Sequence, residues 1–464
     1  MKKSDILIIG GGVAGLMAGI ELAKNNKKVI ILEKESMVGG QCKTEVLQSG
    51  DETYRFDYGG HRFITNNEVL LSFVEEVLGD ELLIAQRSSV ILHQNRIYEY
   101  PLNLKNLFKV APLKLLLGAS FDTLKILFKL VKPNDNNFKS WISSRFGKTL
   151  YNNFFGPYTE KLWGVKPEKL SADWAGQRIS LIDLKDVVKK LLFKNKKTAR
   201  TYAISYRYPK YGFGGLPKKM AEKFIALGGE IIVNESVEKF TFENNKIQLI
   251  HTINSVYQAE EIISTMPLNE MSNKLGYESG LKFRSLRFLC IGLDIEDFSP
   301  HTWQYVSDYD LLPTRIQEPK RRSSSMSPKG KSSIMLEIPC NKNDEIWNMD
   351  EDKLLDIVKK DLKRLHFDIE DKIVDYFSFS TEHAYTLMDI DYNKKRDKTI
   401  NYLNKFDNLI MAGRQGTFRY IFLDTAMETG LMAAQKILET HEMTKEKIYN
   451  HRNEKSVIET KSVA

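Results

Sequence analysis

A glycine-rich turn near the N-terminus constrains the fold more than any other feature of this chain. An apolar run leads into Gly10-x-Gly12-x-x-Gly15, a helical pattern follows, and a second apolar run ends in Glu33. In such a unit the first glycine allows the tight turn, the second lets the backbone approach a pyrophosphate, and the third lets the helix pack on the strand. The helix N-terminus attracts phosphate, and the acid accepts hydrogen bonds from a ribose. The complete strand, turn, helix, strand and acid therefore predict a dinucleotide site.

A second glycine pair, Gly39-Gly40, follows this acid after a short stretch of the chain. A pair at this place is similar to that of flavoproteins of the glutathione-reductase type, in which the chain turns back over the cofactor. The alternative is an ordinary solvated turn, since glycine pairs commonly mark turns. The resemblance implies that the dinucleotide is FAD.

Length and composition indicate a large globular protein. The chain has 464 residues, of which 42% are hydrophobic, and this is enough for two or three domains. No apolar run reaches the length of about 18 residues that spans a membrane. The nearest one, residues 102–131, is interrupted by five lysines and an aspartate. It predicts either a segment on a membrane surface or a solvated helical face that covers a core.

Cysteine usage and the N-terminal pattern favour a cytoplasmic protein. The three cysteines show neither metal spacing nor a disulfide framework, which suits a reducing compartment. The first strand begins directly at the N-terminus and leaves no room for a secretion signal.

The net charge of +8 admits either nucleic acid or an anionic small molecule as a partner. The basic residues are mostly scattered, and they form no array interleaved with aromatic residues such as nucleic-acid binders carry. No Ser-His-Asp order, zinc spacing, Walker loop or carboxylate pair stands out. We therefore expect an anionic small substrate, and neither nucleic acid nor a metal site.

The cofactor domain is expected to be discontinuous, because strand and helix patterns typical of it return at residues 408–413 and 426–438. Residues 230–233 and 247–251 suggest a small separate sheet. The predicted fold class is α/β: a Rossmann-like FAD-binding domain of the glutathione-reductase type with a helical insertion and a mixed-sheet substrate domain. The expected boundaries are 1–100, 203–280 and 393–440 for the cofactor domain, 101–202 for the helical insertion, 281–392 for the substrate domain and 441–464 for a charged tail.

Several longer motifs follow one another in a recognisable order. They are FDYGGHRF (56–63), WISSRFG (141–147), PYTEKLWGV (157–165), DWAGQRI (173–179), YRYPKYGFGG (206–215), SIMLEI (333–338), EHAY (382–385) and GRQGTFRY (413–420). This order resembles that of UDP-galactopyranose mutases of the eukaryotic type. It is also similar to that of bacterial flavoproteins of the protoporphyrinogen-oxidase and amine-oxidase kind. The resemblance covers residues 5–437, nearly the whole chain.

On the cofactor side, the resemblance implies roles for the GGH motif and for the strand and helix near the end of the chain. Gly60 lets the backbone pass close to a flat ring, and His61 matches a histidine that contacts the flavin near its reactive nitrogen. The alternative for His61 is a histidine satisfied within a turn. Arg414 follows the late strand where a flavin pyrophosphate would pass. Asp424 lies at the start of the last long helix, whose positive end stabilises charge on a reduced flavin.

On the substrate side, Arg178 and Arg315 match positions at which the mutases hold a substrate diphosphate. Planar guanidinium groups are good donors to phosphate oxygens. The alternative for each arginine is a surface or interdomain ion pair, and the local match at Arg315 is the shorter one. Tyr420 matches a tyrosine that reaches the substrate phosphates. Tyr385 resembles another such tyrosine, although Thr386 stands where a proline usually follows.

The leading function that the resemblance implies is a FAD-dependent nucleotide-sugar pyranose–furanose mutase, with the reduced flavin as nucleophile at the anomeric carbon. NADH or NADPH would then serve as external reductant, and a homo-oligomer would be a compatible assembly. The alternative is a FAD-dependent oxidoreductase of the protoporphyrinogen oxidase or amine oxidase type, which would hold its substrate in an aromatic or apolar slot. The chain is shorter after Tyr420 than the fungal mutases and lacks their asparagine. The base and the sugar of the substrate therefore stay open.

Overall fold

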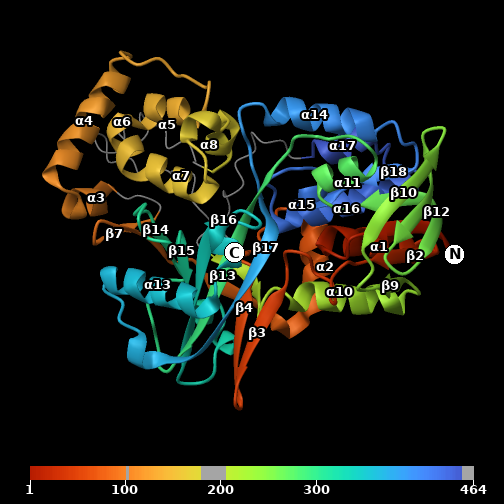
Figure 1. The fold of residues 1–464 in the computed structure, drawn as a ribbon, viewed down its shortest axis with the longest axis horizontal. Coiled ribbons are helices and arrows are strands. Elements are labelled where there is room, and N and C mark those ends of the chain that lie inside the picture. Colours follow the sequence, from red (N-terminus) through yellow and green to blue (C-terminus); the bar gives the residue numbers. More distant parts are fainter. Residues whose placement is uncertain (101–103, 179–204, 452–464) are drawn as a thin grey trace.

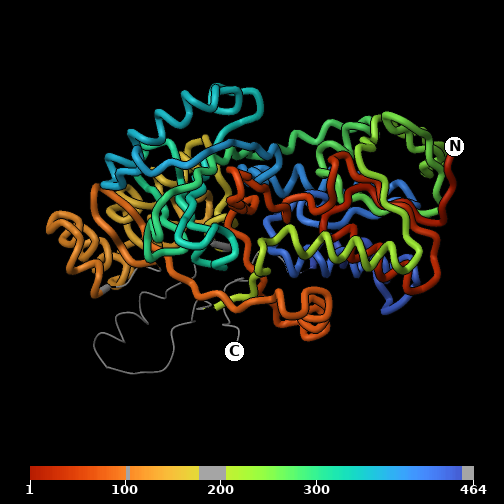
Figure 2. The backbone as a smooth tube through the Cα atoms, turned by 90° about the horizontal axis from the view of Figure 1, so that it is seen from below, coloured from red at the N-terminus to blue at the C-terminus, as the bar shows by residue number. Residues whose placement is uncertain are grey.

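The computed structural model describes residues 1–100, 104–178 and 205–451. These residues form a sheet-and-helix body at the N-terminal end of the molecule, a second body built on another sheet, and a helical lobe beside that second body (Figure 1). The N-terminus and the helical lobe lie at opposite ends of the long axis, as the perpendicular view also shows (Figure 2).

The first body is built on a mixed seven-stranded sheet. Its strands are β1 (Lys2–Ile9), β2 (Val29–Leu32), β9 (Glu230–Ile232), β10 (Val237–Glu243), β11 (Lys246–Thr252), β12 (Val256–Ser264) and β18 (Leu409–Met411). The order is β10-β11-β12-β1-β2-β9, with β18 also paired to β12. The pairs β18–β12, β12–β1, β1–β2 and β2–β9 are parallel, and β10 and β11 are added antiparallel. β2 is buried along its whole length, as expected of a central parallel strand.

This sheet confirms the α/β fold class and corrects one detail of the expected organisation. Residues 230–233 and 247–251 do not form a small separate sheet, because β9 pairs with β2 and β11 pairs with β12 in the main sheet. The strand expected at residues 408–413 is present as β18. It comes from near the C-terminal end of the chain and pairs in parallel with β12. Pairing between segments so distant in sequence is what makes this body discontinuous.

Small residues let the helices of this body pack closely on one another. α1 (Val13–Lys24) contacts both α10 (Gly215–Ala226) and α16 (Leu423–Ile437). A Cβ atom on Gly19 would lie 3.0 Å from the Phe224 ring, and one on Gly430 would lie 2.0 Å from the Ala14 carbonyl oxygen. The remaining helices of this body are α2 (Glu68–Leu78), α11 (Leu268–Lys274), α14 (Tyr392–Leu403), α15 (Gly413–Gly416) and α17 (Lys445–Tyr449).

The second body is built on another seven-stranded sheet. Its strands are β6 (Ser89–His93), β7 (Arg96–Glu99), β13 (Phe283–Leu293), β14 (Trp303–Val306), β15 (Arg315–Gln317), β16 (Ser332–Cys340) and β17 (Ile373–Thr386), in the order β17-β13-β16-β15-β14-β6-β7. It is mixed, because β14 and β6 are parallel while the other pairs are antiparallel. α12 (Glu345–Asn348) and α13 (Glu351–Arg364) accompany it. β6 and β7 belong to this sheet, although our boundary at residue 100 placed them with the cofactor domain.

Two short antiparallel pairs lie outside the two large sheets. β3 (Thr44–Ser49) pairs with β4 (Glu52–Asp57), and β5 (Leu82–Gln86) pairs with β8 (Ser205–Pro209). Short 3-10 segments lie at Gly79–Glu81, Pro167–Lys169, Pro319–Arg321, Ser324–Met326 and Glu370–Lys372.

The helical lobe occupies the region expected for the helical insertion. It contains α3 (Leu104–Val110), α4 (Leu113–Leu127), α5 (Phe138–Phe146), α6 (Lys148–Leu150), a π-helical turn (Tyr151–Phe155), α7 (Gly156–Trp163) and α8 (Ala172–Arg178). Within the described ranges, none of the helices combines the length and the apolar character that crossing a bilayer requires.

The segment expected to be a charged tail begins with a packed helix. In α17, Ile448 and Tyr449 are buried, and the Tyr449 hydroxyl accepts a hydrogen bond from the Met411 N–H at 3.3 Å. The carbonyl oxygens of Tyr449 and His451 also accept hydrogen bonds from buried arginines. The charged composition of this segment led us to expect a solvated tail, although a few of its apolar residues are buried in the protein. The rest of it, residues 452–464, lies outside the described residues.

Candidate active site

The glycine-rich turn has the backbone shape that its sequence predicts. Gly10 has a φ of 103°, and a Cβ atom there would lie 2.2 Å from the Thr265 Oγ1 atom. A Cβ atom on Gly15 would lie 2.1 Å from the Gly10 carbonyl oxygen. Both glycines are therefore required by the protein itself, because a side chain at either position would displace neighbouring atoms.

Gly12 differs from these two glycines in its surroundings and its backbone conformation. Its φ is −72°, which any residue adopts, and the nearest atom to a Cβ placed there is the Gly40 Cα at 4.0 Å. Neither backbone strain nor packing within the protein requires a glycine. The space beside Gly12 lies at the N-terminus of α1, where free N–H groups favour phosphate. A cofactor pyrophosphate fits this cradle, which a side chain would fill.

Glu33 is held by the same turn. Its Oε2 atom accepts a hydrogen bond from the Gly11 N–H at 2.8 Å, and its Oε1 atom accepts one from the Glu35 N–H at 3.0 Å. Burial raises the pKa of this carboxyl group, and the two N–H donors oppose that rise. Each oxygen keeps a further lone pair for a hydroxyl donor, which fits a ribose.

The second glycine pair lies directly on this turn. Gly39 forms an isolated parallel bridge with Gly12, and its N–H donates to the Gly11 carbonyl oxygen at 2.9 Å. Gly39 and Gly40 have φ values of 125° and 56°, so both adopt conformations that favour glycine. The pair is therefore a second wall of the Gly12 cradle rather than a solvated turn.

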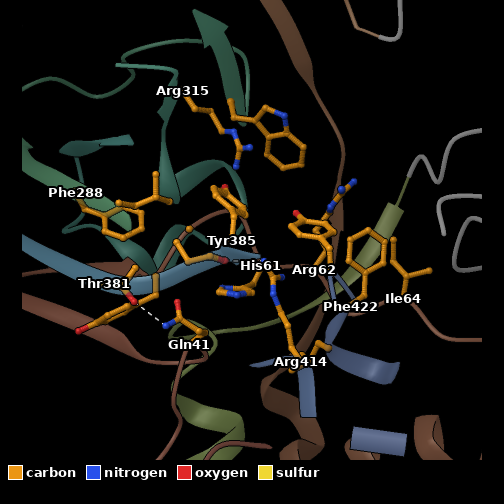
Figure 3. Close-up of a pocket in the computed structure, with 18 of the residues that line it drawn as sticks. Gln41, His61, Arg62, Ile64, Phe288, Arg315, Thr381, Tyr385, Arg414 and Phe422 are labelled. Atoms are coloured by element: carbon orange, nitrogen blue, oxygen red, sulfur yellow. Dashed lines mark hydrogen bonds between the residues drawn. The ribbon is translucent and has the colours of Figure 1, made fainter. Parts of the chain in front are cut away.

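A pocket lies between the two bodies, beside the GGH motif (Figure 3). The GGH loop contributes Gly60, His61 and Arg62, and the late segment contributes Arg414 and Tyr420. The second sheet supplies Phe288, Trp303, Tyr305, Arg315, Thr381 and Tyr385. Gln41 also lines the pocket, and its Nε2 atom donates to Thr381 Oγ1 at 2.7 Å.

His61 faces this pocket as a neutral imidazole. Burial, followed by the charges of Arg414, Arg322 and Arg315, lowers the pKa of His61 to about 3. Its Nδ1 atom is buried and has no hydrogen-bond partner among the described residues. Its ring lies 5.7 Å from the ring of Phe213. A buried ring nitrogen beside a pocket is suited to hydrogen-bond a polar atom of a bound group. Without such a partner, the buried nitrogen costs free energy.

Arg414 and the two predicted tyrosines form one cluster. The Arg414 guanidinium lies 4.2 Å from the centre of the Tyr420 ring and 5.9 Å from that of Tyr385, within cation–π range. Its Nη2 atom donates to the Ala384 carbonyl oxygen at 2.8 Å. Figure 3 shows Gln41, His61, Tyr385 and Arg414 around the same space. Arg414 thus lies at the pocket, and its side chain is fixed by aromatic stacking.

Arg315 lies on the opposite side of the pocket, in a buried ion pair. Its Nη1 atom is 3.0 Å from Oε1 of Glu337, the residue directly across from it in the β15–β16 ladder. Its Nε atom is buried and has no hydrogen-bond partner among the described residues. The guanidinium lies 5.3 Å from the centre of the Tyr305 ring. One edge of Arg315 is therefore neutralised, while the group still lines the pocket.

Two predicted residues do not enter this description. The side chain of Arg178, at the end of α8, lies outside the described residues. Asp424 is buried in the first turn of α16 and is not among the residues that line the pocket.

The sequence interpretation missed the aromatic and arginine residues around Trp303. Trp303 and Tyr305 alternate along β14 and both line the pocket. The guanidinium groups of Arg62, Arg87 and Arg322 lie 5.1, 5.8 and 5.7 Å from the Trp303 ring. The alternation of the aromatic residues in WQYV was the one signal available, because residues two apart in a strand share a face.

A βαβ unit with a glycine-rich turn and an acid oriented by that turn is typical of a dinucleotide-binding protein. Residues 13–438 match the family described as flavin containing amine oxidoreductase, and the chain belongs to this family. It is thus a flavin-dependent enzyme of the amine oxidase superfamily, as the motif order predicted.

Individual relatives are distant in sequence. The chain is 22% identical to a dTDP-fucopyranose mutase of Escherichia coli over 93% of its own length and 98% of that protein. It is 21% identical to a UDP-galactopyranose mutase of Mycoplasma pneumoniae, over 94% and 97% of the two chains. A match to a UDP-galactopyranose mutase of Mycoplasma genitalium reaches 28% identity but spans only 36% of this chain and 41% of that protein.

Solved structures confirm the fold. A reduced UDP-galactopyranose mutase superposes with a TM-score of 0.83 at 20% identity, covering 97% of this chain and 98% of the other. A putative protoporphyrinogen oxidase from Exiguobacterium sp. 255-15 superposes with a TM-score of 0.73 at 14% identity, covering 95% and 99%. One fold of this kind serves more than one chemistry, so the reaction has to be argued from the site.

Proposed function

We propose that this flavoenzyme is a FAD-dependent nucleotide-sugar pyranose–furanose mutase. The observation that carries the proposal is the pocket itself, in which Arg315, Tyr385, Arg414 and Tyr420 surround a space next to neutral His61. A diphosphate needs several cationic and hydroxyl donors at one place. The two full-length relatives described above are both named as nucleotide-sugar mutases, which supports the same choice.

The cofactor would be held at two places. Gly12 and Glu33 would hold the pyrophosphate and the adenosine ribose of FAD, and the GGH loop would bring His61 against the flavin ring. When bound in its reduced form, the flavin supplies the nucleophile for the anomeric carbon. The protein contributes binding, orientation and electrostatics, as in other cofactor enzymes. NADH or NADPH would provide the reducing equivalents.

The arginine and tyrosine residues would bind and activate the leaving group. As the bond from the anomeric carbon to the diphosphate breaks, negative charge develops on the phosphate oxygens. Donors fixed in advance stabilise such charge without reorganising. Arg315 is fixed by Glu337, and Tyr420 is fixed by its stacking on Arg414. We assign Arg178 to the same diphosphate on the resemblance alone.

His61 would act as a neutral partner of the flavin. Because its pKa is lowered to about 3, it carries no charge at neutral pH. A neutral ring donates one hydrogen bond and accepts another, so it can orient a polar atom of the flavin without adding a proton.

The alternative function is that of a FAD-dependent oxidoreductase of the protoporphyrinogen oxidase or amine oxidase type. The apolar part of the pocket wall favours it, since Leu286, Phe288, Trp303 and Phe422 could face an apolar substrate. We prefer the mutase, because two guanidinium groups and two tyrosines line the pocket and the buried Nε atom of Arg315 has no hydrogen-bond partner among the described residues, which suits an anionic rather than an apolar substrate.

The decisive experiment combines reduction with a screen of nucleotide sugars. Protein reduced by dithionite, NADH or NADPH under anaerobic conditions should convert one nucleotide sugar between ring sizes for many turnovers per reducing equivalent. Oxidised protein should be inactive with the same compound. Product that forms only in proportion to an electron acceptor, with no ring-size change in any compound, would replace the mutase by the oxidoreductase.

We further infer a cytoplasmic location, because all three cysteines are buried and free, which fits a reducing compartment. A homo-oligomer remains a proposal that sedimentation of the purified protein would test.

A further inference from the structure

An exposed apolar stripe runs along α4 at the outer end of the helical lobe. The large apolar side chains that are at least half exposed there are Leu113, Leu117, Phe121, Leu124, Phe128 and Leu130. Phe128 and Leu130 are each 73% exposed. Scattered exposed apolar residues are ordinary, but a contiguous set on one helix marks an interaction site.

The spacing of these residues places them on one face. At roughly 100° per residue, Leu113, Leu117, Phe121 and Leu124 fall within an arc of roughly 80°. Phe128 follows directly after the helix and continues the stripe. The stripe is therefore one continuous apolar face of the helix rather than a set of scattered exposed residues.

The opposite face of α4 anchors the helix to the lobe. Leu115 is buried in a cluster with Tyr98, Leu107 and Phe154. A Cβ atom on Gly118 would lie 2.9 Å from the Thr149 Oγ1 atom, which shows how closely α4 approaches the segment beginning at α6. The apolar stripe is thus held outward by a packed inner face.

The charged residues near the stripe are almost all positive. Residues 104–134 contain six lysines and one acidic residue. Lys109, Lys114, Lys129 and Lys132 are exposed, and the Lys125 ammonium lies 4.2 Å from the centre of the Phe121 ring. The one acid, Asp122, accepts a hydrogen bond from the Thr149 N–H at 2.7 Å and faces the lobe.

We propose that the α4 stripe, together with the lysines that border it, binds the surface of an anionic lipid bilayer. A helix with an apolar face and lysines beside it lies in the plane of a membrane interface, with its apolar side chains among the lipid chains. Lysines near the surface add attraction to anionic headgroups. This mode of binding needs no helix that crosses the bilayer, and none of the described helices is long and apolar enough to cross one.

A second copy of the chain is a poorer occupant of this face. A two-fold interface places the same patch on both partners, so it would bring the two lysine borders together. Like charges repel, and residues 104–134 offer no free acid to compensate, because Asp122 is already engaged with Thr149. A surface of opposite charge meets no such repulsion.

The position of the stripe suits a peripheral contact. α4 lies at the outer end of the molecule, away from the sheet that carries the N-terminus (Figures 1 and 2). The lobe follows Tyr100, whose ring centre lies 4.9 Å from that of Tyr305, a residue of the pocket wall. A bilayer bound by α4 would therefore hold the lobe, and the pocket wall next to it, near the membrane.

Vesicle sedimentation tests this inference independently of the catalytic proposal. The full-length protein should sediment with vesicles of phosphatidylcholine and phosphatidylglycerol, less with pure phosphatidylcholine, and less at high salt. The variant Phe121→Ser/Phe128→Ser should lower the partition coefficient about tenfold or more, because two aromatic rings no longer enter the lipid. Lys114→Glu/Lys129→Glu should abolish the preference for anionic vesicles.

A matched control removes exposed apolar groups elsewhere. Val69→Ser/Ile225→Ser changes side chains of α2 and α10 that are also exposed, and it should bind vesicles like the unmodified protein. Flavin absorbance and circular dichroism should be the same in all variants. Three outcomes would overturn the proposal: no sedimentation with anionic vesicles, equal binding by the phenylalanine variant, or a dimer in solution that the phenylalanine variant dissociates.

Discussion

Arg315 donates to Glu337 at 3.0 Å, and the two residues lie directly opposite each other on β15 and β16. Glu337 is almost fully buried and also accepts a hydrogen bond from Gln317. The pair fixes a guanidinium at the wall of the pocket before any ligand binds. This arrangement connects stability and binding, because a change at either residue leaves a buried charge without its partner.

The first prediction concerns stability. Arg315→Met should lower the free energy of unfolding by about 3–5 kcal/mol, because Glu337 would remain buried without its counter-charge. Adding Glu337→Gln should recover a large part of that loss, since the remaining amide is neutral. Urea denaturation of the three proteins measures both effects. A double variant no more stable than Arg315→Met would show that the ion pair is not what the single change disrupts.

The second prediction concerns ligand binding. Arg315→Ala should weaken the binding of UDP or dTDP by about 2–5 kcal/mol, as expected on removing one partner of a buried charged contact. Arg315→Lys should lose less, because it keeps the charge but not the planar donor pair. Calorimetry on folded, flavin-bound protein provides the measurement.

A control for the second prediction is available on the surface. Arg364 forms an exposed pair with Asp310, so Arg364→Ala should leave nucleotide affinity and stability nearly unchanged. If Arg315→Ala binds the nucleotides as tightly as Arg364→Ala does, the diphosphate assignment is refuted and the oxidoreductase alternative gains support.

The third prediction concerns the cofactor. Gly12→Val should yield largely flavin-free protein, because the new side chain would occupy the cradle beside the α1 N-terminus. The apoprotein should remain folded, since φ at Gly12 is −72° and the nearest atom to a Cβ is 4.0 Å away. Absorbance spectra report the flavin, and circular dichroism reports the fold. Full flavin occupancy in this variant would contradict the assignment of the cradle.

The sequence predicted the backbone shape of this turn well because its determinants are local. The turn at Gly10 follows from backbone geometry, and the strands on either side follow from short apolar runs. The same reasoning could not place β6 and β7, whose pairing with β14 joins residues far apart in the chain. Strand partners depend on tertiary contacts, and composition near residue 100 does not reveal them.

In the candidate site, too, the features that depend on local sequence could be predicted, and those that depend on strand register could not. His61 could be singled out from its place between two glycines and an aromatic residue, and the structure brings it to the pocket. The partner of Arg315 could not be predicted, because Glu337 faces it only through the register of β15 on β16. The anchoring of α17 was missed for a related reason: its two buried residues are outnumbered by charges in the sequence.

The fourth prediction concerns pH and follows from His61. Its pKa is about 3 in the folded protein and near the ordinary value of 6.5 in the unfolded chain, so the unfolded state binds more protons between these values. The free energy of unfolding is therefore unaffected by His61 above about pH 6.5, and it falls as the pH is lowered below that value. Between pH 6.5 and pH 5 the loss should be about 1.6 kcal/mol, because the slope reaches 1.36 kcal/mol for each pH unit only below pH 6.5, where the unfolded histidine becomes mostly protonated. His61→Gln, which cannot be protonated, should lose correspondingly less stability over the same range. Urea denaturation at the two pH values measures this difference, and identical losses in the two proteins would show that His61 is not held neutral by its surroundings.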